Sequence, residues 1–299
     1  MKRVIILLSS YNGEAFIEEQ LQSLTAQTGV TTSIIVRDDG STDGTRDILD
    51  RWQESGSLTW YGGDNIGWAD SFMHLLVHAP EADYYAFCDQ DDIWMPDKLK
   101  VAVEHLERHP DTPSLYCSNL LRYQNGKDEG LLLPQQLHYD IYTAMMKCLT
   151  TGCTMVLNKP LADAVRQHAP RHTRAHDFWV YQVAMAIGQV DYDPIPHIHY
   201  RLHEANQVGY KISFTEVWRR RLQILRRRQR QYDREEAAAE LLRCYADQMS
   251  ETNREAVSQV ANYRKSIAQR LRLVTDGRYT MGNIENDFWL KLRILLGKL

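Results

Sequence analysis

The chain has 299 residues, of which 43% are hydrophobic and 25% are charged, and its formal net charge is -4. This length allows one large or two small domains with a substantial core, and the slight excess of acid argues against a dedicated nucleic-acid binder, which is usually basic. The sequence never reaches the roughly 18 consecutive apolar residues of a membrane-spanning helix. Its five cysteines are scattered and form no C-x-x-C pair, which favours a reducing compartment and argues against a zinc site.

The first 120 residues alternate short apolar runs with segments of helical period. The run at 3–8 is too short for a signal peptide and lacks a cleavage site, so it predicts a buried first strand. Further strands are predicted at 33–37, 58–61, 84–88 and 114–118, and helices at 15–27, 45–55, 68–78 and 96–109. This alternation predicts an α/β, Rossmann-like sheet of parallel strands, which binds ligands at the carboxyl ends of its strands.

The pattern becomes less regular between residues 120 and 210. A strand is predicted at 154–157, a helix at 177–187 and a second strand at 197–200. From residue 214 to the end the sequence is almost entirely helical in character. We therefore predict a catalytic domain at 1–210 and a helical C-terminal region at 211–299.

Polar loops follow the first two predicted strands. The first contains Ser10 and Tyr11, and the second begins with Asp38 and Asp39. One interpretation of the second loop is a turn followed by a helix N-cap. The other is a nucleotide contact, in which a carboxylate accepts hydrogen bonds from a base or a ribose. Two adjacent aspartates directly after a buried strand favour the nucleotide contact.

A third loop carries three carboxylates within four residues, at Asp89, Asp91 and Asp92. Such groups repel one another unless a cation lies among them. Oxygen ligands at this density suit Mg²⁺ or Mn²⁺, and the sequence does not distinguish the two metals. The alternative is a solvated acidic loop in which Asp92 caps the following helix.

Two further motifs lie in the less regular region. Asp177 stands in His-Asp-Phe-Trp at a predicted helix start, where it is either an N-cap or a functional carboxylate. His203 ends a Tyr-Arg-Leu-His run. A lone histidine is usually structural, but a suspected metal nearby makes His203 a candidate ligand.

Taken in this order, the motifs from residue 3 to about 210 resemble the inverting family-2 glycosyltransferases of the GT-A fold. The Asp-Gln-Asp-Asp-Ile-Trp loop, followed by Thr-Gly, His-Asp-Phe-Trp and Tyr-Arg-x-His, is similar to the rhamnosyltransferase-like branch. That branch builds bacterial O-antigens and rhamnose-rich cell-wall polysaccharides from dTDP-L-rhamnose. One departure is Ser71, which stands where the family often has Asn. The resemblance implies a Rossmann-like nucleotide-diphospho-sugar transferase fold with a C-terminal helical extension.

The resemblance also implies a role for each matching residue. The donor nucleotide would meet Ser10, Tyr11, Asp38, Asp39 and Asp89. The divalent metal, Mn²⁺ or Mg²⁺, would be held by Asp91 and His203. Asp177 matches the catalytic base. The acceptor side would be formed by Thr151, Gly152 and Trp94.

The implied reaction is transfer of a sugar, L-rhamnose as the first expectation, to a hydroxyl of a lipid-linked or growing surface polysaccharide. The implied acceptor is a saccharide on a polyprenyl diphosphate, and the implied location is the cytoplasm, at the inner face of the bacterial membrane. Two alternatives stay open. One is the same fold with a UDP-hexose or UDP-N-acetylhexosamine donor, and the other is an inactive membrane-bound assembly partner. The G-x-G-x-x-G loop of a dinucleotide-dependent oxidoreductase is absent.

Two apolar stripes at helical spacing mark the C-terminal region. The first, Phe214, Val217, Trp218, Leu222 and Leu225, lies among seven arginines, and the second is Phe288, Leu292, Leu295, Leu296 and Leu299. A basic helix with an apolar face is typical of peripheral membrane contact. The same pattern also fits helices that pack on the catalytic domain.

Overall fold

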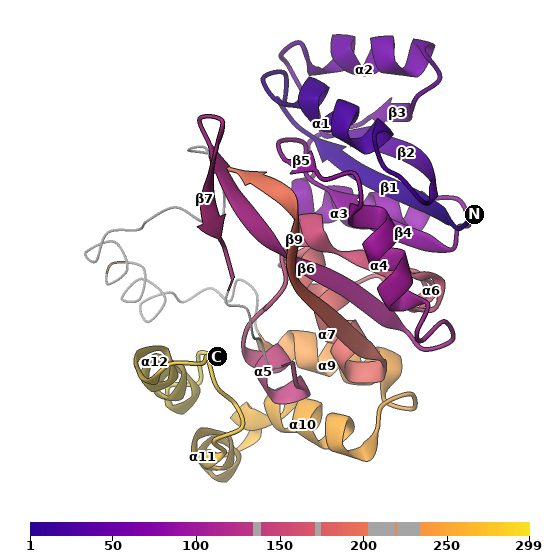
Figure 1. Ribbon diagram of the computed structural model, residues 1–299. Helices are drawn as coiled ribbons and strands as arrows, with labels where there is room; N and C mark the ends of the chain where they lie inside the picture. The colour runs from indigo at the N-terminus through magenta and orange to yellow at the C-terminus, as the bar shows by residue number, and fades with distance from the viewer. Residues whose placement is uncertain (134–138, 171–174, 203–218, 220–233) are drawn as a thin grey trace. The chain divides into compact units, whose positions relative to one another are not determined.

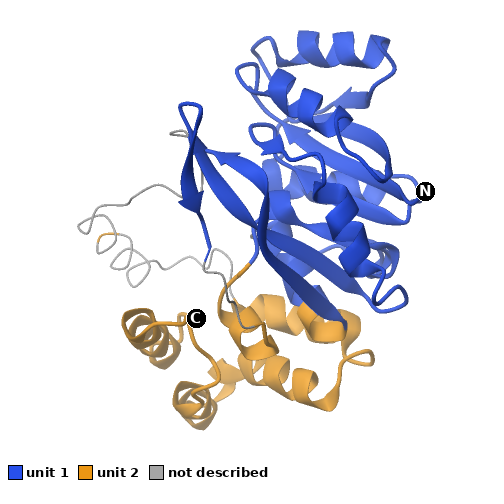
Figure 2. Ribbon diagram, in the orientation of Figure 1, with its two compact units in different colours: residues 1–137, 150–184, 188–203 blue, residues 138–149, 185–187, 204–299 orange. Residues whose placement is uncertain are grey.

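The computed structural model describes residues 1–133, 139–170, 175–202, 219 and 234–299 (Figure 1). The chain divides into two compact units (Figure 2). The sheet unit comprises 1–137, 150–184 and 188–203, and the helical unit comprises 138–149, 185–187 and 204–299. The predicted boundary near residue 210 falls outside the described residues, so a division there stays a prediction.

One nine-stranded sheet forms the centre of the sheet unit. Its strands are β1 (Arg3–Ser10), β2 (Thr31–Asp38), β3 (Thr59–Gly62), β4 (Tyr84–Cys88), β5 (Ile93–Trp94), β6 (Ser114–Gln124), β7 (Lys127–Leu131), β8 (Val156–Asn158) and β9 (Gln189–Arg201). The order is β3-β2-β1-β4-β8-β6-β9-β5, and β7 pairs with β6. The four strands β3, β2, β1 and β4 are parallel, but β8 is antiparallel to β4. The sheet is therefore mixed, whereas the sequence predicted parallel strands.

Helices of the sheet unit bury both faces of strand β1. These helices are α1 (Ile17–Thr25), α2 (Thr45–Glu54), α3 (Trp68–His78), α4 (Lys98–Leu106), α6 (Lys159–Gln167) and α7 (His176–Ile187), whose last turn belongs to the helical unit. Alternate residues of β1 share one core cluster with residues of α1, α2 and α4, while α3 also contacts β1. All five residues from Val4 to Leu8 are fully buried, which confirms the predicted buried strand.

Several predicted elements change in extent. The helix predicted at 96–109 begins only at Lys98, after Asp97 as its N-cap, so the proposed cap at Asp92 is wrong. The predicted strand 197–200 is the end of the longer β9, whose pairing with β6 shifts register where Asn119 pairs with Pro196. Proline is usually confined to strand edges and bulges, which is why this strand escaped the sequence pattern. The short β5 and β7, and the helices α5 (Ile141–Met146) and α6, were not predicted.

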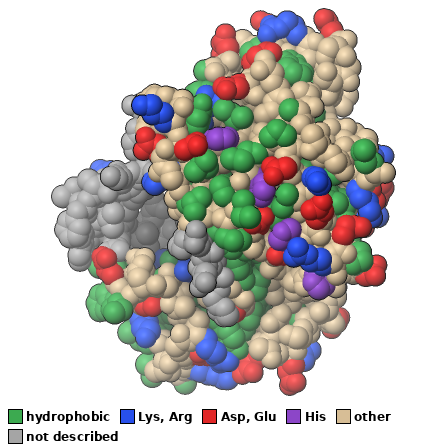
Figure 3. Space-filling model, in the orientation of Figure 1, with side chains coloured by type: hydrophobic (Ala, Val, Ile, Leu, Met, Phe, Trp, Pro, Cys, Tyr) green, Lys and Arg blue, Asp and Glu red, His purple; other side chains and the backbone are tan. Residues whose placement is uncertain are grey.

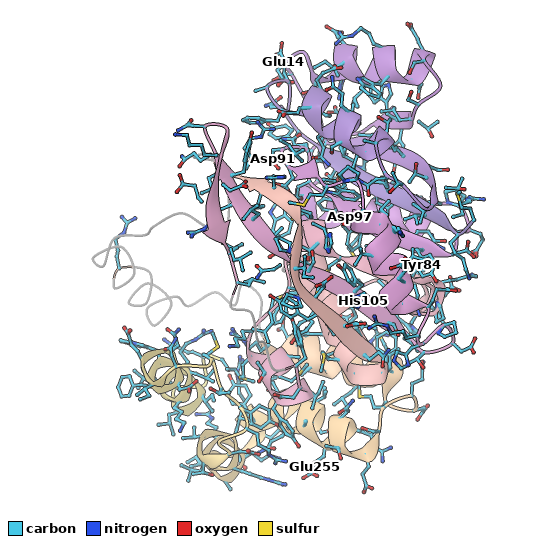
Figure 4. The ribbon with its side chains drawn as sticks, viewed as in Figure 1. Glu14, Tyr84, Asp91, Asp97, His105 and Glu255 are labelled. Atoms are coloured by element: carbon cyan, nitrogen blue, oxygen red, sulfur yellow. The ribbon has the colours of Figure 1, made fainter. Side chains whose placement is uncertain are left out.

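A histidine–aspartate network joins β9 to α4. Nδ1 of His197 lies 3.1 Å from Asp97 Oδ1, and Nε2 lies 3.3 Å from Asp193 Oδ2. The hydroxyl of Tyr116 donates to the same Asp193 oxygen at 3.1 Å. Figure 4 labels Asp97 and the neighbouring His105, and Figure 3 shows histidine and acidic side chains gathered on this face. Burial alone would lower the pKa of His197, but the two carboxylates outweigh burial and raise it.

This network is expected to make stability depend on pH. Because the folded pKa of His197 is raised, its contribution is fully present below the unfolded pKa of about 6.5 and is lost as the pH rises through the folded pKa. We expect His197→Gln to reduce the free energy of unfolding at pH 5.5 by about 1–2 kcal/mol, the scale of a buried charged hydrogen bond, and by less at pH 8.5. Denaturant titrations at both pH values measure this difference. An equal loss at both pH values, or the same pattern in the exposed control His109→Gln, would contradict it.

The described part of the helical unit contains α5, α9 (Arg234–Tyr245), α10 (Glu251–Ala261), α11 (Ile267–Thr275) and α12 (Ile284–Leu295). Arg234 joins α9 to α5 by donating from Nε and Nη2 to Met146 O, at 3.0 and 2.8 Å. The second predicted apolar stripe is only partly exposed, because Leu299 is buried. The first stripe lies outside the described residues. Among the described residues, no helix has the length and apolar character needed to cross a bilayer.

Candidate functional site

Polar loops meet at the carboxyl ends of β1, β2 and β4. Tyr11 N donates to Gln90 Oε1 at 2.8 Å, and Gln90 Nε2 donates back to Tyr11 O at 3.0 Å. Asn12 N donates to Ser41 Oγ, and Asn12 Oδ1 accepts from Thr42 N, both at 2.8 Å. Asn12 has a φ of 48°, a region that asparagine tolerates better than most residues. The structure therefore brings the three predicted loops together, and Gln90, which sequence reasoning passed over, links two of them.

Asp38 is completely buried and holds the second loop in shape. It accepts hydrogen bonds from Ser10 Oγ at 3.1 Å, from Ser41 N at 3.0 Å and from Arg46 Nε at 2.7 Å. Burial acts to raise the pKa of Asp38, but these hydrogen bonds outweigh it and leave the pKa below its usual value. The hydroxyl of Ser41 also donates to this carboxylate. With about four acceptor positions in a carboxylate, Asp38 is fully occupied, so it frames the loop rather than offering a free oxygen.

Asp39 is held by donors from three directions. It forms an ion pair with Arg37 and accepts from Ile66 N and Gly67 N, each at 2.9 Å. Arg37 also donates to Ser71 Oγ at 3.1 Å, so the serine that departs from the family pattern supports this pair. Asp39 keeps about one acceptor position for a ligand. Arg37 was not predicted, although a charged residue at the end of an apolar strand was a usable signal.

Carboxylates also converge in the acidic loop after β4, where Figure 4 labels Asp91. Ligand atoms of Asp89, Asp92 and Cys153 lie within 4.8 Å of one another. Burial, followed by the charges of Asp91 and Asp177, raises the pKa of Asp89 to about 7. Burial and the two neighbouring aspartates also raise the pKa of Asp92 well above its usual value. Without a cation, burial and mutual repulsion therefore oppose the ionisation of these carboxyl groups.

This donor set fits a hard divalent cation. Burial raises the pKa of the Cys153 thiol well above its usual value, which keeps the thiol protonated and a poor ligand. The remaining donors are carboxylate oxygens, which Mg²⁺ and Mn²⁺ prefer. Within this set the carboxylates of Asp89 and Asp92 would hold such an ion, and the charge of the predicted ligand Asp91 raises the pKa of both. The other predicted ligand, His203, lies outside the described residues.

Trp94, which was predicted on the acceptor side, lies in the core. It is 2% exposed and belongs to the core cluster below the acidic loop. The Lys98 ammonium lies 3.4 Å from the centroid of its ring, and Lys98 is itself completely buried. Burial lowers the pKa of Lys98 to about 8. Trp94 thus packs in the core against Lys98, and its acceptor role stays a prediction.

Asp177 lies in the first turn of α7, near the acidic loop. The N-cap of α7 is Ala175, so the N-cap interpretation of Asp177 is wrong. Asp177 Oδ1 accepts from the backbone N–H of Phe178 at 2.7 Å. Its charge contributes to the raised pKa of Asp89, although the two residues are far apart in sequence. A carboxylate beside a possible cation site is well placed to remove a proton from a bound hydroxyl.

Next to Asp177, His176 is enclosed in an aromatic box. Its ring lies 4.1 Å from that of Phe72, 4.8 Å from that of Phe87 and 5.6 Å from that of Trp68, measured between centroids. Neither ring nitrogen has a hydrogen-bond partner among the residues that the structure describes. Burial lowers the pKa of His176 to about 3, so the imidazole is neutral at physiological pH. His176 thus anchors the start of α7 without adding charge to the carboxylates.

The absence of a side chain at Gly152 leaves room for the His176 ring. Together with its N-cap Thr151, this glycine begins the short 3₁₀ turn Gly152–Thr154. A Cβ added at Gly152 would lie 2.8 Å from His176 Nε2 and 3.6 Å from Asp177 Cβ. These distances bring the predicted acceptor segment against the predicted base. Their functional roles stay predictions.

Gly152→Ala is therefore expected to displace the start of α7. The packed imidazole cannot move aside, so we expect a loss of about 1–3 kcal/mol in stability and about 10²-fold in transfer. The control is Gly277→Ala, because an added Cβ there meets no atom of the described residues within 4 Å. Melting curves and transfer rates of both variants provide the measurement. Wild-type transfer by Gly152→Ala would show that the contact does not position Asp177.

Comparison with known proteins agrees with this geometry. The family model described as "Glycosyl transferase family 2" matches residues 5–164, which is more than half of the chain. The chain is 32% identical to the dTDP-rhamnosyl transferase RfbG of Shigella flexneri over 232 residues, covering 71% of this chain and 77% of RfbG. It is also 32% identical, over 49% of its length and 60% of the relative's, to TuaG, a putative teichuronic acid biosynthesis glycosyltransferase of Bacillus subtilis.

Two solved structures share the fold. Residues 1–349 of Staphylococcus aureus TarS, in complex with UDP-GlcNAc, superpose with a TM-score of 0.55 at 18% identity, covering 100% of this chain and 93% of that one. The mannosyltransferase PcManGT of Pyrobaculum calidifontis, in complex with GDP-Man and Mn²⁺, superposes with a TM-score of 0.50 at 16% identity, covering 99% and 86%. At these identities the likeness concerns the fold, which is the GT-A fold expected from the motifs.

Proposed function

We propose, from the premise that this chain belongs to glycosyl transferase family 2, that it transfers L-rhamnose from dTDP-L-rhamnose to a saccharide hydroxyl with inversion at the anomeric carbon. The observation that carries the proposal is the convergence of Asp91 and Asp177 on Asp89, whose pKa both charges raise. In this proposal the start of α7 supplies the base, and the loop after β4 supplies the metal site.

The proposed reaction is a single displacement. The Asp177 carboxylate takes the proton from the attacking acceptor hydroxyl as its oxygen bonds to the sugar C1. The bond between C1 and the diphosphate oxygen breaks, and the nucleoside diphosphate leaves with both electrons. A divalent cation held by the carboxylates of the loop after β4, with Asp91 as a proposed ligand, would supply the positive charge that stabilises this leaving group. The sequence of events needs no covalent enzyme intermediate.

The nucleotide end of the donor is assigned to the loops after β1 and β2. Tyr11 is 47% exposed and is available to pack against a base. Asp39 offers its remaining acceptor position to a base N–H, while Asp38 and Ser10 keep the loop in shape. The identity to a dTDP-rhamnosyl transferase supports dTDP-rhamnose as the donor. UDP-hexoses and UDP-N-acetylhexosamines are the competing donors.

A donor-binding screen tests this proposal. Calorimetry or thermal shift with dTDP-rhamnose, UDP-glucose, UDP-galactose and UDP-N-acetylglucosamine, each with and without Mn²⁺, should show metal-dependent binding of dTDP-rhamnose. Metal-dependent binding of a UDP-sugar instead would keep the reaction and change the donor. A folded protein that binds none of the four would favour the inactive assembly partner.

We also propose a lipid-linked acceptor at the inner face of the cytoplasmic membrane. Support comes from α12, where Ile284, Phe288 and Leu295 are 92%, 60% and 45% exposed at helical spacing, with Lys291 between the last two. Exposed apolar side chains beside a cation favour an anionic membrane surface. Sedimentation with vesicles containing an anionic lipid checks this contact, and no binding at low salt would contradict it.

A further inference from the structure

Trp68 is a large aromatic side chain that stays half exposed near the loops of the candidate site. It is the first residue of α3 and is 47% exposed. A single exposed apolar side chain is common on protein surfaces. Trp68 is not isolated, because Ile66 and Tyr11, which are 43% and 47% exposed, belong to the loops that are bonded to Asp39 and its neighbours. Exposed apolar side chains gathered at a polar site are typical of a ligand-binding groove.

Backbone hydrogen bonds connect Trp68 to the nucleotide side of the site. The N–H groups of Ile66 and Gly67 donate to Asp39, and Asp39 N donates to Ser10 O at 2.7 Å. Gly67 has a φ of 84°, so the chain turns there and Trp68 follows directly as the start of the helix. A Cβ added at Gly67 would meet no atom of the described residues within 4 Å. The turn that binds Asp39 therefore borders open space.

The ring of Trp68 reaches the side of the site that holds the proposed base. Its centroid lies 5.6 Å from that of His176, and the two ring planes are inclined at 79°. In a perpendicular contact His176 covers at most one face of the indole, and the remaining surface accounts for the exposure of the side chain. Asp177 follows His176 directly. Trp68 therefore links the residue assigned to the nucleotide base, Asp39, with the residue assigned to the acceptor hydroxyl.

The transferred sugar has the same place within a sugar nucleotide. It follows the nucleoside diphosphate and carries the carbon that the acceptor attacks. The face of an aromatic ring carries partial negative charge, so it attracts the weakly positive C–H groups of a sugar ring. A diphosphate gains nothing from an uncharged apolar surface, because it would lose hydration there without a partner. The chemistry of the indole therefore favours the sugar over the diphosphate as its partner.

We propose that the ring of the donor sugar packs on the indole of Trp68, and that this contact lets the protein distinguish a sugar nucleotide from the bare nucleoside diphosphate. The inference deepens the proposed function and rests on it for the place of the donor, but not for the identity of the sugar. In this role Trp68 binds and orients the sugar and exchanges no proton with it. A 6-deoxyhexose such as rhamnose adds a methyl group to the apolar surface that the indole can contact.

The test compares Trp68→Leu and Trp68→Phe with the wild-type full-length chain. Calorimetry in the presence of Mn²⁺ measures the affinities for dTDP-rhamnose and for dTDP. We expect Trp68→Leu to lose about fivefold to tenfold in affinity for dTDP-rhamnose, the scale of one aromatic contact, and to bind dTDP within about twofold of wild type. Trp68→Phe should retain most of the affinity for the sugar nucleotide. The control is Val77→Ala, an exposed apolar residue at the other end of α3, which should change neither affinity.

Leucine keeps an apolar side chain against His176, and melting curves verify that each variant is folded. Equal losses for dTDP and dTDP-rhamnose in Trp68→Leu, or undiminished binding of both, would overturn the assignment of Trp68 while leaving the proposed donor in place. If the wild type binds one of the UDP-sugars instead, the same comparison is made between that UDP-sugar and UDP. A selective loss of the UDP-sugar would then uphold Trp68 and reject rhamnose. A folded wild type that binds no sugar nucleotide would contradict both proposals.

Discussion

Asp177→Asn is expected to reduce transfer by about 10²–10⁴-fold, the usual contribution of a positioned general base, while donor binding stays within about twofold of wild type. Asparagine keeps the size of the side chain but cannot accept the proton of the acceptor hydroxyl. The loss should appear in kcat, because we propose that the loops after β1, β2 and β4 bind the donor. Initial rates with a saccharide acceptor and calorimetry with the donor measure the two quantities.

The matched control is Asp47→Asn. Asp47 lies in the first turn of α2 as Asp177 lies in the first turn of α7, so both changes remove a favourable charge at a helix N-terminus. Only the change at Asp177 should slow transfer. Wild-type turnover by Asp177→Asn would remove this residue from the mechanism, and equal losses in both variants would reduce its role to helix stability.

Asp91→Ala is expected to abolish metal-dependent donor binding, with an affinity loss of about 10²-fold or more. Loss of groups that merely support a metal ligand already costs about 10–100-fold, and Asp91 is proposed as a ligand itself. For the stability of the metal-free protein we expect no loss. The charge of Asp91 raises the pKa of Asp89, so its removal should relieve repulsion and leave the metal-free protein at least as stable as the wild type.

Two measurements therefore separate a metal-binding role of Asp91 from a structural one. Calorimetry with Mn²⁺ and donor should show lost affinity, while thermal unfolding without metal should show no lost stability. The exposed aspartate at position 111 provides the control, because Asp111→Ala should change neither quantity. An unchanged metal affinity in Asp91→Ala would assign the cation to other ligands. A large loss of metal-free stability would instead give Asp91 a structural role.

Sequence patterns predicted most of the first half of the fold. The strand 84–88 and the helix 68–78 have the predicted bounds, and most other elements before residue 110 shift by a few residues, whereas the strand predicted at 114–118 extends to Gln124. These segments were readable because both faces of the central strands are buried and their helices carry one apolar stripe. The two-residue β5 and the charged, glycine-containing β7 carry no such pattern, and the prolines of β9 conceal its length.

The sequence by itself determined the reaction class, because the ordered loops after the strands identify the family without any coordinates. Only the tertiary structure decided which side chains meet. It placed Asp177 beside Asp89, enclosed His176 against Gly152 and buried Trp94 in the core. The physical reason is the separation in sequence over which each effect acts. Periodicity and turn chemistry act between near neighbours in the chain, whereas burial, pKa shifts and cavities depend on packing between segments that are distant in sequence.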